Sequence, residues 1–156
     1  MVVLVGLGKR MNDVELPDEV TLAAVYVDED LIELEAVIRA GHWRGRARAY
    51  TVPQCISTFI TALERFADGE ISEAEFTAGA DTGIGLAALR FYKVDRSGHI
   101  VCHVRLATGY STANQRPEEV FRLSIEVKTE AWAVIRFARQ LGEMVQTQAG
   151  KASLNA

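Results

Sequence analysis

The chain has 156 residues, of which 49% are hydrophobic and 24% are charged, and its formal net charge at pH 7 is −4. This length is typical of one domain, and the composition excludes a disordered chain, a collagen and a coiled coil. No stretch approaches the roughly 18–20 apolar residues that a membrane-spanning helix needs. The N-terminus lacks the basic-then-apolar order of a signal peptide, and the two cysteines, Cys55 and Cys102, are too few for a disulfide framework. We therefore expect a cytoplasmic protein with no membrane segment.

The first half of the chain predicts strands. Residues 2–7 form a short apolar run, and residues 21–27 are rich in β-forming side chains. Residues 31–40 and 43–50 alternate apolar and polar side chains, a period typical of half-buried strands. A tight turn at 41–42 would join the last two as a hairpin. In that hairpin Arg44, Arg46 and Arg48 share one face and can lie opposite Glu33 and Glu35, which stabilises the strand pair.

Two amphipathic helices are predicted, one after each group of strands. The first follows a capping pattern at 51–54 and ends at Gly69, and the second follows a cap at Thr129. A further helical turn is expected at 72–75, where the capping pattern repeats. The apolar stripe of the first helix comprises Ile56, Phe59, Ile60, Leu63 and Phe66, and that of the second comprises Ala131, Val134, Ile135, Ala138, Leu141 and Val145.

The second half predicts a β-meander of residues 86–94, 99–106 and 120–127, in which Phe121, Leu123, Ile125 and Val127 lie on one side of the last strand. Hairpin residues at 95–98 join the first two of these strands. The sequence thus predicts an α+β fold: a single antiparallel sheet of about six strands with both helices packed on one face. We expect one domain over residues 1–146 and a flexible tail over 147–156, which has no periodicity.

No set of residues predicts catalysis, a metal site or a cofactor. His99 and His103 lie about 13 Å apart on a strand, which is too far for one zinc ion. Cys55 has no identifiable base. The glycine-rich motif at 83–88 follows a polar loop and opens a strand, whereas a nucleotide-binding motif follows a strand and opens a helix.

Charge is uneven along the chain, and it marks the residues that we expect to meet a partner. Residues 1–40 hold nine acidic and three basic residues, a balance of −6. The three arginines at 44–48 are the only basic cluster and are too few for nucleic-acid binding. The predicted partner-binding residues are Asp28, Glu29, Asp30, Glu33, Glu35, Trp43, Arg44, Arg46 and Arg48. A second acidic set comprises Glu70, Glu73, Glu75 and Asp81.

Residues 25–145 resemble the WapI-type immunity proteins of bacterial polymorphic toxin systems. In that family a strand runs into a helix of the form LxxLxxLxxG, a meander follows, and a strand of alternating apolar residues leads into a C-terminal helix. Here the first helix carries Phe59, Leu63 and Phe66 and ends in the sequence LERFADG (63–69), and FRLSI (121–125) leads into the second. The first 20 residues and the arginine-rich strand depart from the pattern. The resemblance implies a non-enzymatic protein that occludes the active site of a cognate toxin, and an acidic face would suit a basic nuclease toxin.

Two other readings stay open. One is a small-ligand-binding or dimerisation domain, with Trp43, Tyr50, Tyr92 and His103 on a concave sheet face and a homodimer as its assembly. The other is an enzyme of unknown class, for which titratable groups clustered in a deep cleft would be the evidence.

Overall fold

The computed structural model describes residues 16–80, 84–109 and 115–155, and the strand expected at 2–7 lies outside them. Within these parts the chain alternates groups of strands with two helices, as the sequence predicts. The strands are β1 (Glu19–Val27), β2 (Ile32–Ala40), β3 (Trp43–Thr51), β4 (Glu73–Gly79), β5 (Leu86–Lys93), β6 (Ile100–Ala107), β7 (Arg122–Thr129) and β8 (Lys151–Asn155). The helices are α1 (Pro53–Ala67), the short 3-10 helix η1 (Pro117–Glu119) and α2 (Ala131–Thr147).

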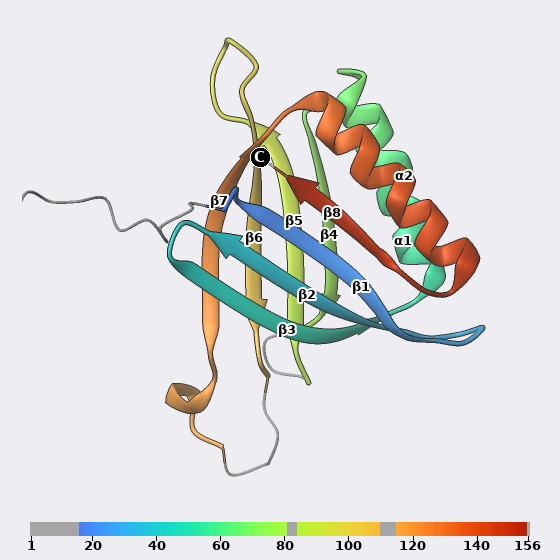
Figure 1. The fold of residues 1–156 in the computed structure, drawn as a ribbon, viewed down its shortest axis with the longest axis vertical. Helices are drawn as coiled ribbons and strands as arrows, with labels where there is room; N and C mark the ends of the chain where they lie inside the picture. Colours follow the sequence, from blue (N-terminus) through green and yellow to red (C-terminus); the bar gives the residue numbers. More distant parts are fainter. Residues whose placement is uncertain (1–15, 81–83, 110–114, 156) are drawn as a thin grey trace, which may run out of the picture.

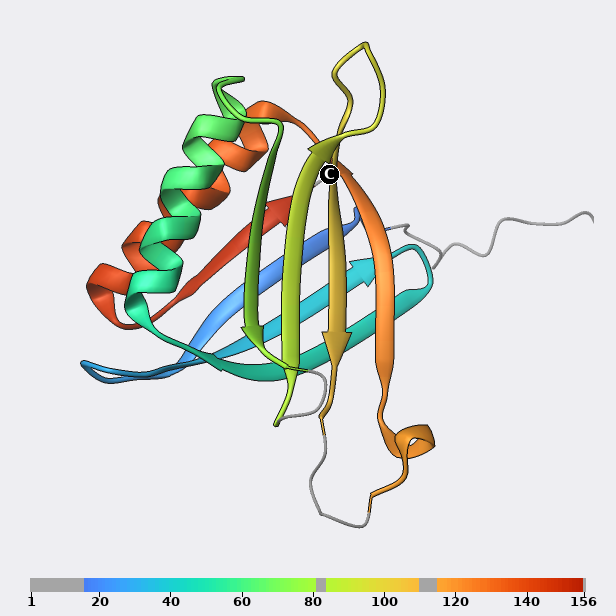
Figure 2. The same cartoon turned by 180° about the vertical axis from the view of Figure 1, so that it is seen from behind.

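The strands form two antiparallel sheets, not the single six-stranded sheet expected from the sequence. The first sheet has the order β3-β2-β1-β8, and the second has the order β4-β5-β6-β7. Figures 1 and 2 show the first sheet running across the second, with the strand directions at a large angle. The α+β class and the antiparallel pairing are thus confirmed. Alternation within a strand shows which side chains are buried but not against which layer they pack, so the sequence could not separate the two sheets.

Glycines let the backbones of the two sheets approach closely where β3 crosses the second sheet. A methyl group on Gly45 would lie 3.0 Å from Leu123 Cδ2 of β7. At the start of β5, a methyl group on Gly85 would lie 1.9 Å from the carbonyl oxygen of Arg48. Gly79 ends β4 with a φ of +72°, a conformation that favours glycine. β3 is therefore held directly against the second sheet along its length.

Both helices lie side by side on one flank of the two sheets (Figure 1). α1 buries Ile56, Phe59, Leu63 and Phe66, as expected. The buried stripe of α2 is rotated from the expected one, because Ile135 is 50% exposed. The residues of α2 that are buried are Ala133, Val134, Phe137, Ala138, Leu141 and Met144. No helix in the described ranges is both long and apolar enough to cross a membrane.

An aromatic cluster joins the helices to the second sheet. Phe91 of β5 is fully buried, and its ring centroid lies 6.1 Å from Phe59, 6.4 Å from Phe66 and 6.2 Å from Phe137. Phe76 of β4 stacks on Phe59 at 5.0 Å. Such ring pairs stabilise a core by more than the burial of their apolar surface alone would. The cluster therefore fixes both helices against the same strands.

Three local predictions were wrong for a common reason. Thr51 and Thr129 are each the last residue of a strand and are buried, so neither caps a helix. The helices instead begin after Val52 and Glu130, which make no side-chain cap bond. Residues 72–75 open β4, because the alternating pattern of the following residues places every second side chain in the core. In each case burial within a sheet overrides the local capping pattern. The left-handed end of α1 at Gly69, with a φ of +80°, is confirmed.

The tail expected at 147–156 is wrong for its last residues. Residues 151–155 form β8, which pairs antiparallel with β1, so that Glu19 lies opposite Asn155. Ala152 and Leu154 are fully buried. These five residues alternate polar and apolar side chains, a strand signal that the sequence analysis missed. A bond from the Ser153 N–H to Gln140 Oε1 (2.8 Å) ties β8 to α2.

Candidate functional site

The expected hairpin pairing of glutamates with arginines is present on the outer face of the first sheet. β2 and β3 pair in a register that places Glu35 opposite Arg48 and Glu33 opposite Tyr50. Arg48 Nε lies 3.2 Å from Glu35 Oε2, and Arg48 Nη1 lies 3.7 Å from Glu33 Oε1. Arg46 Nε lies 3.9 Å from Glu35 Oε1. We call Glu33, Glu35, Arg46 and Arg48 the charged face.

The charged face is not the acidic surface that the sequence suggested. The glutamate side chains are recessed, at 19–20% exposure, whereas Arg46 is 70% and Arg48 is 56% exposed. Each glutamate is thus compensated by an arginine that stands above it. A partner approaching this face meets guanidinium groups first and carboxylates behind them, an arrangement that suits a surface with charges of both signs.

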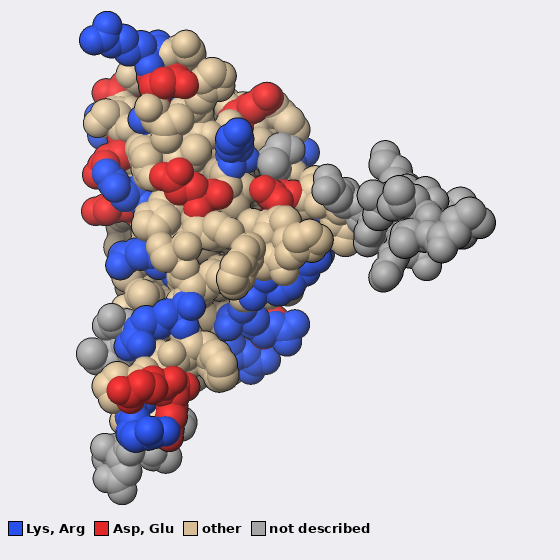
Figure 3. Space-filling model, turned by 90° about the vertical axis from the view of Figure 1, so that its left-hand side faces the viewer, with Lys and Arg blue, Asp and Glu red and all other residues tan. Residues whose placement is uncertain are grey.

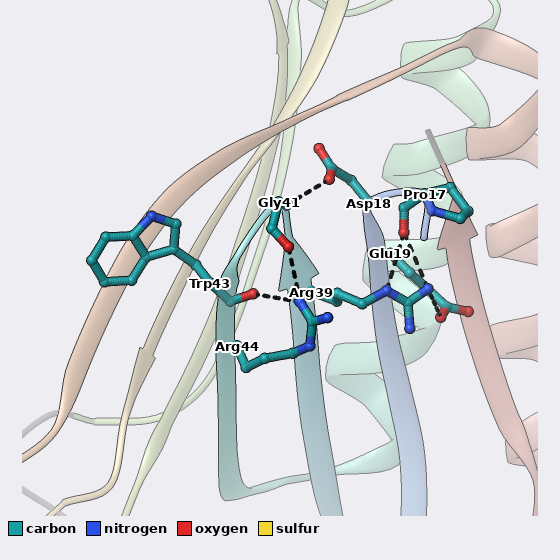
Figure 4. A network of polar contacts seen from close by, with 7 residues as sticks. All are labelled: Pro17, Asp18, Glu19, Arg39, Gly41, Trp43 and Arg44. Atoms are coloured by element: carbon teal, nitrogen blue, oxygen red, sulfur yellow. Dashed lines mark hydrogen bonds and ion pairs between the residues drawn. The ribbon is translucent and has the colours of Figure 1, made fainter. Parts of the chain in front are cut away.

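Trp43 and Arg44 stand at the end of the same hairpin but do not join the charged face. Arg44 Nη1 donates to the carbonyl oxygens of Gly41 and Trp43, both at 3.1 Å, so it is used in the turn. Figure 4 shows the Trp43 side chain projecting away from the hairpin, on the side opposite Arg39 and Glu19. Because side chains alternate along a strand, Trp43 and Arg44 also point to opposite faces of β3.

The acidic turn between β1 and β2 has a structural role that the sequence did not reveal. Asp28 Oδ1 accepts bonds from the N–H groups of Asp30 (2.9 Å) and Leu31 (2.7 Å). These backbone donors hold the pKa of the Asp28 carboxyl below its usual value. Glu29 and Asp30 lie beside Asp28 on this exposed turn. The turn lies at the end of the hairpin opposite Trp43, so the predicted partner-binding residues are spread along the first sheet.

The second acidic set does not form one surface. Glu70 pairs with Arg65 at 3.1 Å after the end of α1, and Glu73 pairs with Arg90 at 2.7 Å on the second sheet. Glu75 lies opposite Arg90 in the register of β4 and β5, and Asp81 lies outside the described residues. Arginines therefore compensate two of these four acidic residues, Glu70 and Glu73.

The outer face of the second sheet carries polar contacts that the sequence analysis missed. His103 Nε2 lies 2.7 Å from Ser124 Oγ, and the Tyr92 hydroxyl contacts Glu126. That hydrogen bond raises the pKa of Tyr92. A shallow hollow of about 310 Å³ lies beside these residues. Its polar lining comprises Glu75, Thr77, Arg90, His103 and Arg105. Period-two spacing of the polar residues on neighbouring strands was the signal that could have located this face.

The structure does not bring together the four rings of the small-ligand alternative. Tyr50 lies on the outer face of the first sheet, opposite Glu33, whereas Tyr92 and His103 lie on the outer face of the second. Trp43 is 67% exposed at the end of the hairpin. They therefore line no common concave face, and that expectation is wrong.

The residues weighed for chemistry are also separated. Cys55 is exposed on α1, whereas Cys102 is fully buried in β6, and burial raises the pKa of the Cys102 thiol. His99 contacts Asp95 in the β5–β6 hairpin and lies four residues along the chain from His103, which pairs with Ser124. Among the residues that the structure describes, no three His, Cys, Asp or Glu side chains lie close enough to hold one metal ion.

Comparison with known proteins adds no relative. No protein-family model, curated protein or solved structure gives a match to this chain.

Proposed function

We propose that this protein is a non-enzymatic protein-binding module, an immunity protein that neutralises a cognate bacterial toxin by covering its active site. The observation that carries the proposal is the charged face. It is a preformed surface, because β2 and β3 pair with each other along their full length. Arginine is enriched at protein interfaces, and Arg46 and Arg48 are the most exposed members of this face. The interleaved glutamates fix how a partner must be oriented, because a shifted partner would bring like charges together.

The mechanism requires no residue of this chain to react. A rigid sheet face loses little conformational entropy when it docks, and Arg48 is already held by a hydrogen bond to Glu35. The toxin is blocked because its catalytic cleft is covered. On this proposal the toxin carries both acidic and basic groups around that cleft, with the acidic groups nearest Arg46 and Arg48.

The proposal predicts that a toxin domain is encoded beside the gene of this protein, and the test uses that domain; its absence would count against the proposal. Association of the two proteins is measured by stopped-flow fluorescence at low and high salt, and protection is measured as growth of bacteria that express the toxin domain. Arg46→Glu should slow association by about tenfold at low salt and much less at high salt, because exposed charges act mainly on the association rate. Protection should weaken in parallel.

The matched control is Arg139→Glu on α2. Arg139 is as exposed as Arg46, at 70%, and its contact with Glu143 is equally loose, at 4.0 Å. The change in net charge is identical, so any non-specific electrostatic effect appears in both variants. Equal rates for Arg46→Glu and Arg139→Glu would remove the charged face from the proposal, and a toxin domain that does not bind the wild-type protein would end it.

A further inference from the structure

The outer edge of β7 is an open sheet edge. β7 is the last strand of the second sheet, and no other strand of the described ranges pairs with its far side. The Thr108 N–H donates to the Phe121 carbonyl at 3.0 Å, and the Phe121 N–H donates to Thr108 Oγ1 at 3.1 Å, so the backbone of Phe121 is turned toward β6. Because backbone direction alternates along an antiparallel strand, the even-numbered residues present their N–H and C=O groups outward. These residues are Arg122, Ser124, Glu126 and Lys128.

Each of the other three edge strands contacts an element outside its own sheet. β4 contacts α1, β8 contacts α2, and β3 lies against β4, β5 and β6. An uncovered edge is a template for another strand, and proteins normally protect it. β7 has eight residues and no proline, so it lacks one of the usual protections.

Apolar side chains line the same edge. Phe121 is 79% exposed just before β7, and Leu123 and Ile125 are only partly buried. Figure 3 views this side of the molecule and shows an uncharged area flanked by charged side chains. The sequence placed Phe121, Leu123 and Ile125 on one side of a strand, and their incomplete burial means that part of this apolar face lacks a cover.

Trp43 overhangs the position that an added strand would take. β3 crosses β7 at Gly45, which faces Leu123, and Trp43 points to the same side of β3 as Gly45. Trp43 lies two residues beyond Gly45, which is about 6–7 Å along β3, and this distance exceeds the spacing of about 4.8 Å between neighbouring strands of a sheet. The hairpin end also extends past β7 in Figures 1 and 2. The exposed indole therefore lies above the place of a strand paired to β7.

We infer that a second copy of this chain occupies the edge, with β7 paired antiparallel to β7 of the other copy in one register. Ser124 lies at the two-fold axis opposite its own equivalent, and Arg122 of each copy lies opposite Glu126 of the other. On the inner side, Leu123 lies opposite Ile125, and Phe121 lies opposite Val127. The two second sheets then form one continuous sheet, and each Trp43 covers part of the other copy's strand.

Charge favours this register over its neighbours. A shift of one step toward the N-terminus would place Arg122 opposite Ser124 and Glu126 opposite Val120, which removes both arginine–glutamate contacts. A shift of one step toward the C-terminus would place Arg122 opposite Lys128, and a shift of two steps would place Glu126 opposite its own equivalent. Like charges directly opposite one another destabilise a strand pair. In the proposed register both symmetric contacts join an arginine to a glutamate, and Lys128 lies opposite the apolar Val120. The inference does not depend on the proposed toxin partner, because the charged face lies on the first sheet.

The test is a charge swap measured by sedimentation equilibrium on the full chain. The wild type should form a dimer in a concentration-dependent manner. Arg122→Glu and Glu126→Arg should each weaken dimerisation by about tenfold or more, because both symmetric contacts become repulsive. An equimolar mixture of the two variants should form a heterodimer as strong as the wild type, since each contact then joins opposite charges. Lys128→Glu is the control and should leave the dimer unchanged.

A second measurement reads the register directly. In the Cys55→Ser background, Ser124→Cys should form a disulfide-linked dimer on mild oxidation, because residues opposite one another in such a pair are about 5.5 Å apart. Lys128→Cys should not. Circular dichroism verifies that each variant is folded.

Three results would overturn the inference. The first is a wild type that stays monomeric at the highest soluble concentration, which would leave the edge to another occupant. The second is a dimer that tolerates both single charge reversals. The third is a mixture of the two variants that associates no better than either alone.

Discussion

Replacing Gly85 with alanine should force the two sheets apart where β3 crosses the start of β5. The new methyl group would lie 1.9 Å from the carbonyl oxygen of Arg48, whereas real Cβ contacts stay beyond about 3.0 Å. The backbone of β3 or β5 must therefore move by about 1 Å. Overpacking of a core costs about 1–3 kcal/mol, and a clash with backbone cannot be relieved by a side-chain rotation. We expect a loss of about 3 kcal/mol from the free energy of unfolding.

Gly142→Ala provides the matched control, because the chemical change is the same. Gly142 lies inside α2, and a methyl group there would meet no heavy atom within 4 Å. Alanine is favoured over glycine in a helix by about 0.5–1 kcal/mol, so this variant should be more stable than the wild type. Urea denaturation followed by circular dichroism gives both free energies, provided that the dependence on urea is unchanged. A Gly85→Ala variant within about 0.5 kcal/mol of the wild type would refute the close approach of the sheets.

Three further outcomes test the fold. Leu154→Ala should lower the free energy of unfolding by about 2–5 kcal/mol in urea denaturation, because Leu154 is fully buried in β8, and an effect below about 0.5 kcal/mol would mean that this segment does not pair with β1. A thiol reagent should label Cys55 in the native protein and Cys102 only after unfolding, since Cys102 is buried and burial raises the pKa of its thiol. Mass spectrometry of the labelled peptides distinguishes the two cysteines, and labelling of Cys102 in the native protein would contradict its burial. The folded-state pKa of Asp28 lies below its unfolded value, so its ionised form contributes stability that is lost as pH falls through the folded pKa. The urea midpoint of Asp28→Asn should therefore depend less on pH below about pH 4 than that of the wild type. An identical pH dependence would contradict the hydrogen bonds of the turn.

The sequence predicted those features that depend on a local period. The hairpin of β2 and β3, with Arg48 opposite Glu35, follows from alternation and from a two-residue turn. The first helix follows from the spacing of Phe59, Leu63 and Phe66. These patterns are decided by residues close in the chain, and the structure confirms each of them.

The sequence could not assign strands to layers. A small inward side chain fits equally well beneath a helix or beneath a second sheet, so Ala47 and Ala49 gave no sign that β3 is packed on β4 and β5. Glycines at 45, 79 and 85 were the available signal, because glycine within strand patterns often marks the close approach of another backbone. The candidate site was affected in the same way. The sequence grouped acidic residues that the fold separates.

Because β8 completes the first sheet beside β1, the described part of the chain begins and ends on adjacent strands. Residues directly opposite in an antiparallel pair have Cα atoms about 4.5–5.5 Å apart, so a short glycine-rich linker can bridge the span from Asn155 to Glu19. New ends could then be opened in the β5–β6 hairpin at Gly98, which has no neighbour within 4 Å of an added methyl group. The domain is thus suited to circular permutation, in which the order of the elements changes and their packing is retained.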